Sequence, residues 1–479
     1  MFSEGMEFGF YDKAERTANK AQEFYEEGQM SQALEALDTA LEINPANSAW
    51  HFDKALALDS VHRFEDAIAE YELALALNPE DLEILNSLAV DYTRTGQYDR
   101  AIEMFEHIEQ LDVSYEPSYC NRIIAYTEMG LHDQAEEMFY MAQQVSPGCA
   151  LCYYNVGNSL FVRGLYQKAI GCWIKTEELE QSHPQINYRI AQAYWYEGEM
   201  SQARERFLSE LRLNPGDVDV IFDFGLFLLE NDEVESAKEK FNRVLEFRPS
   251  FAPALFYLGE IALNGGTAQQ ALEKYDAALR SDDTLAGPYY RLAQHALMQN
   301  KLIKARAYLL SELRNSPEDA ALLLSIGAMF LTIETNTAAA EDVSISTGED
   351  QASPMGVCSD LDHAMHCLLR AVDADPTHPE TYHTLGVASA MRGAYEDAGE
   401  FFSHALELRH EYFDALRDSG LVLAKQGKYE EAIELMRQAK AYATGNQSVG
   451  GHVLDMRIHQ AMDRLATLTS PLRHFLRRH

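Results

Sequence analysis

Basic residues are scarce in this sequence of 479 residues, which holds 39 Lys and Arg against 76 Asp and Glu. The formal net charge of −37 argues against nucleic-acid binding, because that function needs a basic surface facing the phosphates. The charge is compatible with basic partners, and it also keeps a long exposed surface soluble.

Cysteines and long apolar runs are also scarce. Six cysteines are too few for a disulfide framework in a chain of this length, and this number is typical of a reducing compartment. The sequence has no run of about 18 apolar residues, so we expect no transmembrane segment. The acidic start, MFSEGMEFGFYDK, lacks the basic region of a signal peptide. Together these absences predict a cytoplasmic location.

What the sequence does contain is a repeat of 34 residues, marked by alanines in register. The spacing is 34 at every step but one, and the exception is longer by 25 residues. The twelve alanines are Ala33, Ala67, Ala101, Ala135, Ala169, Ala203, Ala237, Ala271, Ala305, Ala364, Ala398 and Ala432. A fixed period of this length is typical of a solenoid, in which each repeat contacts only its neighbours.

The residues around each alanine predict a helix, a tight turn and a second helix. A second small residue stands twelve positions earlier in most repeats, and a bulky residue often follows by four, as Gly157, Ala169 and Trp173 illustrate. Small side chains on two helices allow a close crossing. Glycines suited to a left-handed helix end recur five residues before the alanine. They are Gly28, Gly96, Gly130, Gly164, Gly198, Gly266, Gly393 and Gly427.

This pattern, nearly complete in AWHFDKALALDSVHRFEDAIAEYELALALNPED, resembles the tetratricopeptide repeat. The resemblance covers about residues 14–442 as twelve repeats. It implies an all-α, right-handed superhelix in which the first helix of each repeat lines a concave groove. Family members mostly bind peptides or partner proteins there. The resemblance therefore implies a non-enzymatic interaction scaffold or adaptor without a cofactor, with a chaperone-like cargo-binding protein as the alternative.

Three segments depart from the repeat. Residues 1–13 form an N-terminal segment, and residues 443–479 are predicted to form a linker, an amphipathic capping helix and a basic tail. Leu454, Ile458 and Met462 recur at helical spacing in that helix. The tenth repeat is interrupted at about residues 334–359, where an acidic stretch without helical periodicity predicts a disordered loop. A tolerated insertion is favoured over a mobile lid.

The first helices of the fifth to ninth repeats carry an aromatic and apolar stripe. Its residues stand three before and four after the small position, so they share one helix face. They are Tyr154 and Phe161, Tyr188 and Trp195, Phe222 and Leu229, Phe256 and Leu263, and Tyr290 and Leu297. We expect this groove to hold an apolar or amphipathic segment of a partner protein, with Asn158, Arg189 and Arg291 fixing its polar groups. The alternative is that the stripe packs against neighbouring helices as core.

Two groups of residues are candidates for metal binding. Cys149 and Cys152 form a CxxC motif, but no second CxxC completes a zinc site, so small hydrophobic residues are the favoured interpretation. His363, His366 and Cys367 stand at helical spacing and provide a remote alternative as a metal site. No catalytic motif accompanies either group, and we predict neither a catalytic residue nor a resident metal.

Overall fold

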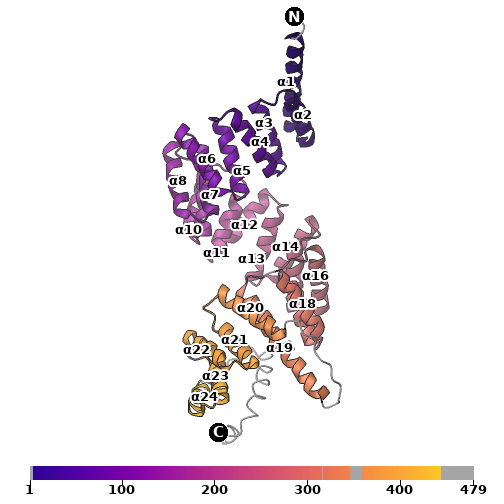
Figure 1. Ribbon diagram of the computed structural model, residues 1–479, viewed down its shortest axis with the longest axis vertical. Coiled ribbons are helices and arrows are strands. Elements are labelled where there is room, and N and C mark those ends of the chain that lie inside the picture. Colours follow the sequence, from indigo (N-terminus) through magenta and orange to yellow (C-terminus); the bar gives the residue numbers. More distant parts are fainter. Residues whose placement is uncertain (1–3, 316, 346–358, 444–479) are drawn as a thin grey trace. The chain divides into compact units, whose positions relative to one another are not determined.

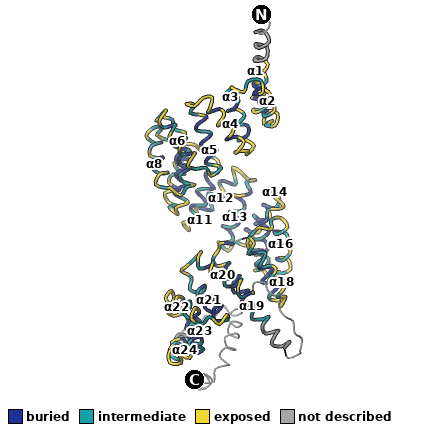
Figure 2. The backbone as a smooth tube through the Cα atoms, viewed as in Figure 1, coloured by how far each residue is buried: buried dark blue, intermediate teal, exposed yellow. Residues whose placement is uncertain are grey.

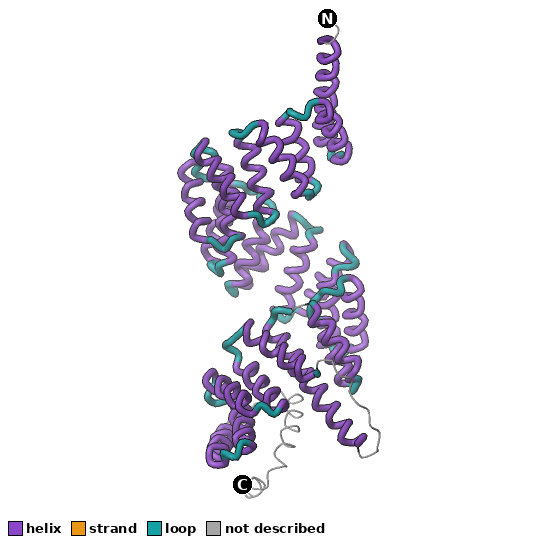
Figure 3. The backbone as a smooth tube through the Cα atoms, viewed as in Figure 1, coloured by secondary structure: helices purple, strands orange, loops and turns teal. Residues whose placement is uncertain are grey.

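The computed structural model describes residues 4–315, 317–345 and 359–443, and every regular element in these residues is an α-helix (Figures 1 and 3). The helices follow one another as twelve helix–turn–helix repeats. The first helices of the repeats are α1 (Glu4–Glu26), α3 (Ser48–Ser60), α5 (Leu82–Arg94), α7 (Glu116–Glu128), α9 (Ala150–Val162), α11 (Ile186–Tyr196), α13 (Val218–Glu230), α15 (Ala252–Asn264), α17 (Pro288–Met298), α19 (Ala320–Ile345), α21 (Pro379–Arg392) and α23 (Phe413–Lys425). The second helices are α2 (Met30–Ile43), α4 (Phe64–Leu77), α6 (Tyr98–Leu111), α8 (His132–Val145), α10 (Tyr166–Leu179), α12 (Met200–Leu213), α14 (Val234–Phe247), α16 (Ala268–Ser281), α18 (Leu302–Arg314), α20 (Asp360–Ala374), α22 (Tyr395–Leu408) and α24 (Tyr429–Ala443). The predicted all-α repeat fold is confirmed.

The chain divides into two compact units, Met1–Phe227 and Leu228–His479, and the boundary falls within α13. Inside each unit a helix packs against its predecessor and its successor along the chain, as α10 does with α9 and α11. Neighbour-on-neighbour packing is the physical basis of a solenoid, since no single repeat can bury its own apolar face.

The alanines that mark the repeat lie at the closest approach between helices. All twelve have an exposed fraction of 1% or less. Figure 2 shows buried residues in dark blue along the helices of the repeats. The small residue twelve positions earlier is required for the same reason. At Gly157, an added Cβ atom would lie 2.5 Å from Nε1 of the buried Trp173. Gly386 stands in the same relation to the ring of Phe402.

The turn inside each repeat uses a left-handed residue. All eight glycines predicted to end a first helix have positive φ angles, between 71° and 85°. Three other repeats place His62, Asp232 and Asn300 at the equivalent position, with φ angles of 61°, 59° and 57°. A side chain with a Cβ atom pays a steric cost in this conformation, so these three turns hold local strain.

We expect His62→Gly to stabilise the second repeat by about 1 kcal/mol, because glycine adopts the left-handed region without a clash. The ring of His62 packs against that of Phe64 at 5.7 Å, and losing this contact offsets part of the gain. The matched change is Gly96→Ala in the next repeat, which puts a Cβ atom into the same conformation and is expected to destabilise it. Urea denaturation of both variants measures the change in the free energy of unfolding. A change of the same sign in both would contradict the interpretation that the left-handed turn strains a residue with a Cβ atom.

Two helices extend past boundaries that the sequence predicts for the repeat array. Helix α1 begins at Glu4, so most of residues 1–13 belongs to the first helix, which no proline interrupts. Helix α19 continues to Ile345, so residues 334–345 of the segment predicted as a loop are helical. The run Ala338–Ala340 has a high helix propensity. The prediction of a loop followed the low apolar content of the segment and did not take this propensity into account. Residues 346–358, and the predicted linker, capping helix and basic tail beyond Ala443, lie outside the described residues.

Among the described residues, one helical stretch, Ala320–Thr337, passes a length-and-hydropathy test for a membrane span, with a mean hydropathy of 1.3. Half of that stretch is buried inside the protein, and core helices of this kind pass the same test. Leu323, Ile326 and Phe330 of α19 are fully buried or nearly so, with exposed fractions of 1% or less. The stretch is therefore weak evidence for a span.

The structure joins Cys120 on α7 to Cys152 on α9 by a disulfide, with Cα atoms 5.1 Å apart. The interpretation of Cys152 as merely a small hydrophobic residue is therefore wrong. The two cysteines are 32 residues apart in the sequence, and only the stacking of adjacent repeats brings them together.

A buried carboxylate in the first unit makes stability depend on pH. Asp91 on α5 is 1% exposed, and its Oδ2 atom is buried without a hydrogen-bond partner. Burial, and secondly the charge of Asp59, raises the pKa of Asp91 from 3.8 to about 6. Since the folded pKa lies above the unfolded one, ionisation of Asp91 costs stability increasingly as pH rises from about 4 to 6, and the full cost persists above.

We expect Asp91→Asn to remove this pH dependence. Between pH 5 and pH 8 the wild-type chain should lose about 1 kcal/mol more stability than the variant, at roughly 1.4 kcal/mol per pKa unit. Thermal denaturation of both proteins at the two pH values measures the difference. If the difference in stability between variant and wild type were the same at pH 5 and at pH 8, Asp91 would not titrate in this range.

Candidate partner-binding surface

The predicted stripe in the first unit lies on α9, α11 and α13. Tyr154, Phe161, Trp195 and Phe222 are half-buried, whereas Tyr188 is only 9% exposed. A half-buried apolar side chain has one side packed against the protein and the other side in contact with solvent. The neighbours of each side chain therefore decide how much apolar surface is accessible to a partner.

Phe161 and Trp195 belong to a cluster of four aromatic rings at the turn end of the fifth and sixth repeats. Tyr166 and Tyr196 stack with their centroids 5.4 Å apart, and Tyr196 stacks on Trp195 at 5.9 Å. Phe161 meets Tyr196 edge-on at 5.6 Å. We call these four residues the aromatic cluster. Tyr196 is 61% exposed, so the cluster presents an aromatic face to solvent.

The inner side of the aromatic cluster rests on the core. Phe161 contacts the ring of Trp173 at 5.7 Å, and Trp195 contacts Phe227 edge-on at 5.9 Å. Rings held on one side by the core lose little conformational freedom when a partner covers the other side. The predicted stripe includes Phe161 and Trp195 of this cluster but not Tyr166 or Tyr196. The aromatic run Tyr194–Tyr196 at the helix end was the available signal.

Tyr188 serves the packing of adjacent first helices. Its hydroxyl donates to Oδ2 of Asp223 at 2.6 Å, and Nε2 of Gln192 donates to both the Tyr188 hydroxyl and Asp223 Oδ2 at 2.9 Å. Burial and the bond to Asp223 raise the pKa of Tyr188 far above its usual range. The network joins α11 to α13, so Tyr188 is a structural member of the stripe.

The polar residues predicted to fix a ligand in the first unit are Asn158 and Arg189. Asn158 is half-buried on α9. Nη1 of Arg189 donates to Oε1 of Gln192 at 3.3 Å, while Nε of Arg189 is buried and has no hydrogen-bond partner in the described residues. The guanidinium of Arg189 lies 5.9 Å from the ring of Tyr188, and its unpaired Nε is shielded from solvent.

Arg291 in the second unit is already committed to a partner within the protein. Its Nε donates to Oε1 of Glu260 at 2.8 Å and its Nη2 donates to the other oxygen. Burial lowers the pKa of Arg291, but the bonds and charge of Glu260 outweigh this and raise it. Tyr275 also donates to Glu260, at 2.6 Å. The geometry does not support the predicted ligand-binding role of Arg291, because its charge is neutralised.

The apolar members of the stripe in the second unit are all half-buried, and they are Leu229, Phe256, Leu263, Tyr290 and Leu297. Phe256 packs on the ring of Tyr275 at 5.8 Å and closely approaches Gly287. Leu263 joins the same core, and Tyr290 and Leu297 pack against the core around α19. For these four residues the alternative interpretation as core packing fits the contacts.

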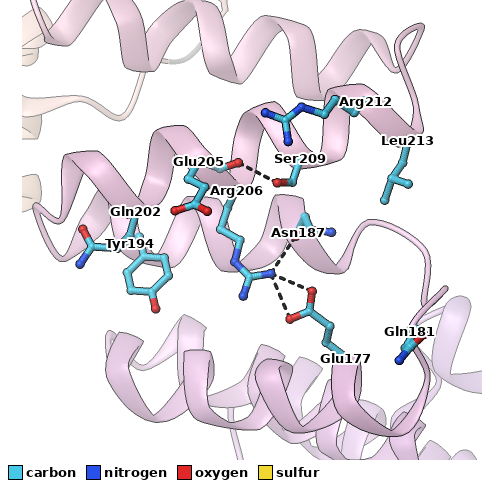
Figure 4. Close-up of a pocket in the computed structure, with 10 residues that line it drawn as sticks. All are labelled: Glu177, Gln181, Asn187, Tyr194, Gln202, Glu205, Arg206, Ser209, Arg212 and Leu213. Atoms are coloured by element: carbon cyan, nitrogen blue, oxygen red, sulfur yellow. Dashed lines mark hydrogen bonds and ion pairs between the residues drawn. The ribbon is translucent and has the colours of Figure 1, made fainter.

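A separate polar pocket of about 650 Å³ lies between α10, α11 and α12 (Figure 4). Nη1 of Arg206 donates there to both oxygens of Glu177, at 2.8 and 3.0 Å, and to Oδ1 of Asn187 at 2.8 Å. Since the charge of Arg206 is neutralised and the lining is polar, this pocket does not suit an apolar segment.

The alternative metal site at His363, His366 and Cys367 does not form. Cys367 is fully buried in the core of α19 and α20, whereas His366 is exposed. The ring of His363 stacks on Phe330 at 5.3 Å. Spacing of three and four residues puts side chains on neighbouring parts of a helix surface, but here one points inward and one outward.

Comparison with known proteins assigns the family. The tetratricopeptide repeat profile matches residues 19–80, 52–112, 188–250, 222–286 and 402–446, about half of the chain. The chain belongs to the tetratricopeptide repeat family. Proteins of this family are generally protein-interaction scaffolds and are typically not enzymes. A search of curated protein sequences finds no match.

Solved structures with a similar arrangement are distant in sequence. A tetratricopeptide repeat protein from Parabacteroides merdae is 16% identical, with 55% of this chain and 99% of that chain covered and a TM-score of 0.44. The Cut9–Hcn1 structure from the APC/C is 14% identical, with coverage of 94% and 96% and a TM-score of 0.38. Yeast Tom70 is 14% identical, with coverage of 95% and 96% and a TM-score of 0.36.

Proposed function

We propose that this chain is a non-enzymatic scaffold that binds an apolar or amphipathic segment of a partner protein on the aromatic cluster of its first unit. The observation that carries the proposal is the solvent-exposed face of the contacting rings of Phe161, Tyr166, Trp195 and Tyr196. Aromatic side chains that the protein core holds in one conformation are typical anchors of protein interfaces.

An exposed apolar residue adjoins the cluster in the sequence. Val162 follows Phe161 at the end of α9 and is 68% exposed. A contiguous exposed apolar patch on a protein is typical of an interaction surface. The net charge of −37 favours a segment whose polar face is basic, since complementary charge speeds association. The partner class that fits is therefore an amphipathic helix with an apolar and a basic face. We further propose a cytoplasmic location for this activity.

Selection from a random peptide library against the full chain tests the proposal. We expect the selected peptides to share large apolar residues at helical spacing, with Lys or Arg on the other face. Uniformly polar or acidic selected sequences would contradict the proposal. Fractionation of cells that express the tagged chain tests the location, and recovery only with membranes would contradict it.

A further inference from the structure

Three cysteines and a carboxylate meet where the fourth repeat packs on the fifth. Glu116 and Cys120 stand four residues apart in the first turns of α7, so they share a helix face. Cys149 is the N-cap residue of α9 and Cys152 lies in its first turn. One ligand atom from each of the four residues lies within 4.8 Å of all the others. The cluster thus completes the CxxC motif with two donors from the preceding repeat.

Apart from the disulfide, the separations within the cluster are close to those of a tetrahedral thiolate site. The Sγ atoms of Cys120 and Cys149 are 3.4 Å apart. Oε1 of Glu116 lies 2.9 Å from Sγ of Cys120 and 3.5 Å from Sγ of Cys152. Zn–S bonds of about 2.3 Å hold two sulfur ligands about 3.8 Å apart around a tetrahedral ion. The Cys120–Cys152 pair, bonded as a disulfide here, must separate to reach this arrangement, and the shorter distances from Cys120 to Cys149 and to Glu116 must widen slightly.

The chemistry of the donors also favours a cation. A disulfide sulfur carries no proton, so in the oxidised state Cys120 cannot donate to the carboxylate oxygen beside it. In the reduced state, three thiolates and a carboxylate concentrate negative charge in a half-buried region. A divalent cation bound there neutralises part of that charge. Soft thiolate donors in tetrahedral geometry select zinc over the hard cations.

We propose that Glu116, Cys120, Cys149 and Cys152 form a zinc site in the reduced protein, and that the Cys120–Cys152 disulfide is its oxidised, metal-free state. The site joins α7 to α9 in both states, through the ion or through the disulfide. It therefore acts as a redox-dependent clamp between two repeats. The zinc site is independent of the partner-binding proposal and of the aromatic cluster.

The conversion balances as follows. A dithiol reductant gives two electrons and two protons to the Cys120–Cys152 bond, which becomes two thiols, and the reductant becomes a disulfide. Zn²⁺ then replaces the protons of three thiols, and three protons leave to solvent while Glu116 supplies the fourth ligand as its carboxylate. Oxidation reverses the sequence and releases the ion.

Metal titration of the full chain tests the site. We expect the reduced protein, desalted without air after incubation with Zn²⁺, to retain one zinc per chain by elemental analysis. Co²⁺ in place of zinc should give the intense visible absorption of a tetrahedral thiolate complex. Cys149→Ser should weaken zinc binding about 100-fold or more, because a primary ligand contributes at least as much as its supporting residues. Glu116→Gln should weaken it as well.

The control is Cys172→Ser, which removes a free thiol outside the cluster. It should bind zinc like the wild-type chain, and circular dichroism should show equal helix content in all variants. The oxidised protein should bind no zinc. Absence of stoichiometric zinc in the reduced chain, equal affinity in Cys149→Ser and wild type, or equal binding by the oxidised chain would each overturn the proposal.

Discussion

Replacing Gly157 with alanine is expected to destabilise the fifth repeat by about 2 kcal/mol, although alanine is the better helix former. The new Cβ atom would lie 2.5 Å from Nε1 of Trp173, a side chain that is 1% exposed and has no free space to enter. Nε1 also donates to the carbonyl of Tyr154 at 3.2 Å, so moving the indole loses that bond. Overpacking of this kind costs about 1–3 kcal/mol, and a lost buried hydrogen bond adds about 1 kcal/mol. Helix propensity returns about 1 kcal/mol.

The matched change is Gly171→Ala on α10 of the same repeat, where a Cβ atom would meet no atom within 4 Å. This variant should be more stable than wild type by about 0.5–1 kcal/mol. Hydrogen exchange of the amides in α9 and α10 reports the local free energy of opening, which suits an array of repeats that need not unfold together. Stabilisation by both substitutions would show that packing does not require a small residue twelve positions before each repeat alanine.

Replacing Tyr196 with serine is expected to weaken binding of a selected amphipathic peptide about 30-fold. An aromatic anchor at an interface commonly contributes 2 kcal/mol or more, and 1.4 kcal/mol corresponds to a factor of ten in Kd. Because Tyr196 is 61% exposed and ends α11, its removal leaves the core intact. Isothermal titration calorimetry with the purified full chain gives the two dissociation constants.

Tyr140 provides the control for this prediction. It is 62% exposed on α8 and lies outside the aromatic cluster, so Tyr140→Ser removes an equally exposed ring without touching the proposed surface. We expect its dissociation constant to stay within a factor of two of wild type. Equal losses in both variants would mean that the peptide binds through general surface hydrophobicity.

The fold could be predicted because the repeat puts the same physical requirement on twelve sets of residues. Each alanine, small residue and turn glycine satisfies the same steric requirement in its own repeat. A departure from the pattern in one repeat therefore does not change the predicted register of the others. His62 shows this, since it adopts the left-handed turn that its position dictates in place of the usual glycine. This redundancy ends at the start of α1 and at the extension of α19, and there local helix propensity decides how far each helix runs.

The candidate surface could be predicted only in part. Helical spacing predicted that Phe161 and Trp195 face the same side of their repeats. It could not show that Tyr166 contacts Phe161 edge-on, or that Tyr196 stacks on Trp195. Spacing also could not show that Arg291 has a partner, because Glu260 belongs to the preceding repeat. Half-burial of the second-unit residues depends on how each side chain packs, which a single sequence does not specify.

The cysteine cluster escaped prediction for a related reason. A CxxC motif was expected to need a second one, whereas the remaining donors come from a Glu and a Cys at helical spacing in the adjacent repeat. In a solenoid, residues close to 34 apart lie on neighbouring helices, so ligand sets should be sought across one repeat period as well as within a motif.

Photo-crosslinking of a bound selected peptide from single positions tests the central claim most directly. A photoreactive phenylalanine derivative is placed at Tyr196 in the aromatic cluster, at Tyr140 on α8, or at Gln202 in the polar pocket. The account predicts efficient crosslinks from position 196 and background levels from positions 140 and 202. Crosslinks from position 202 or 140 without any from position 196 would contradict it.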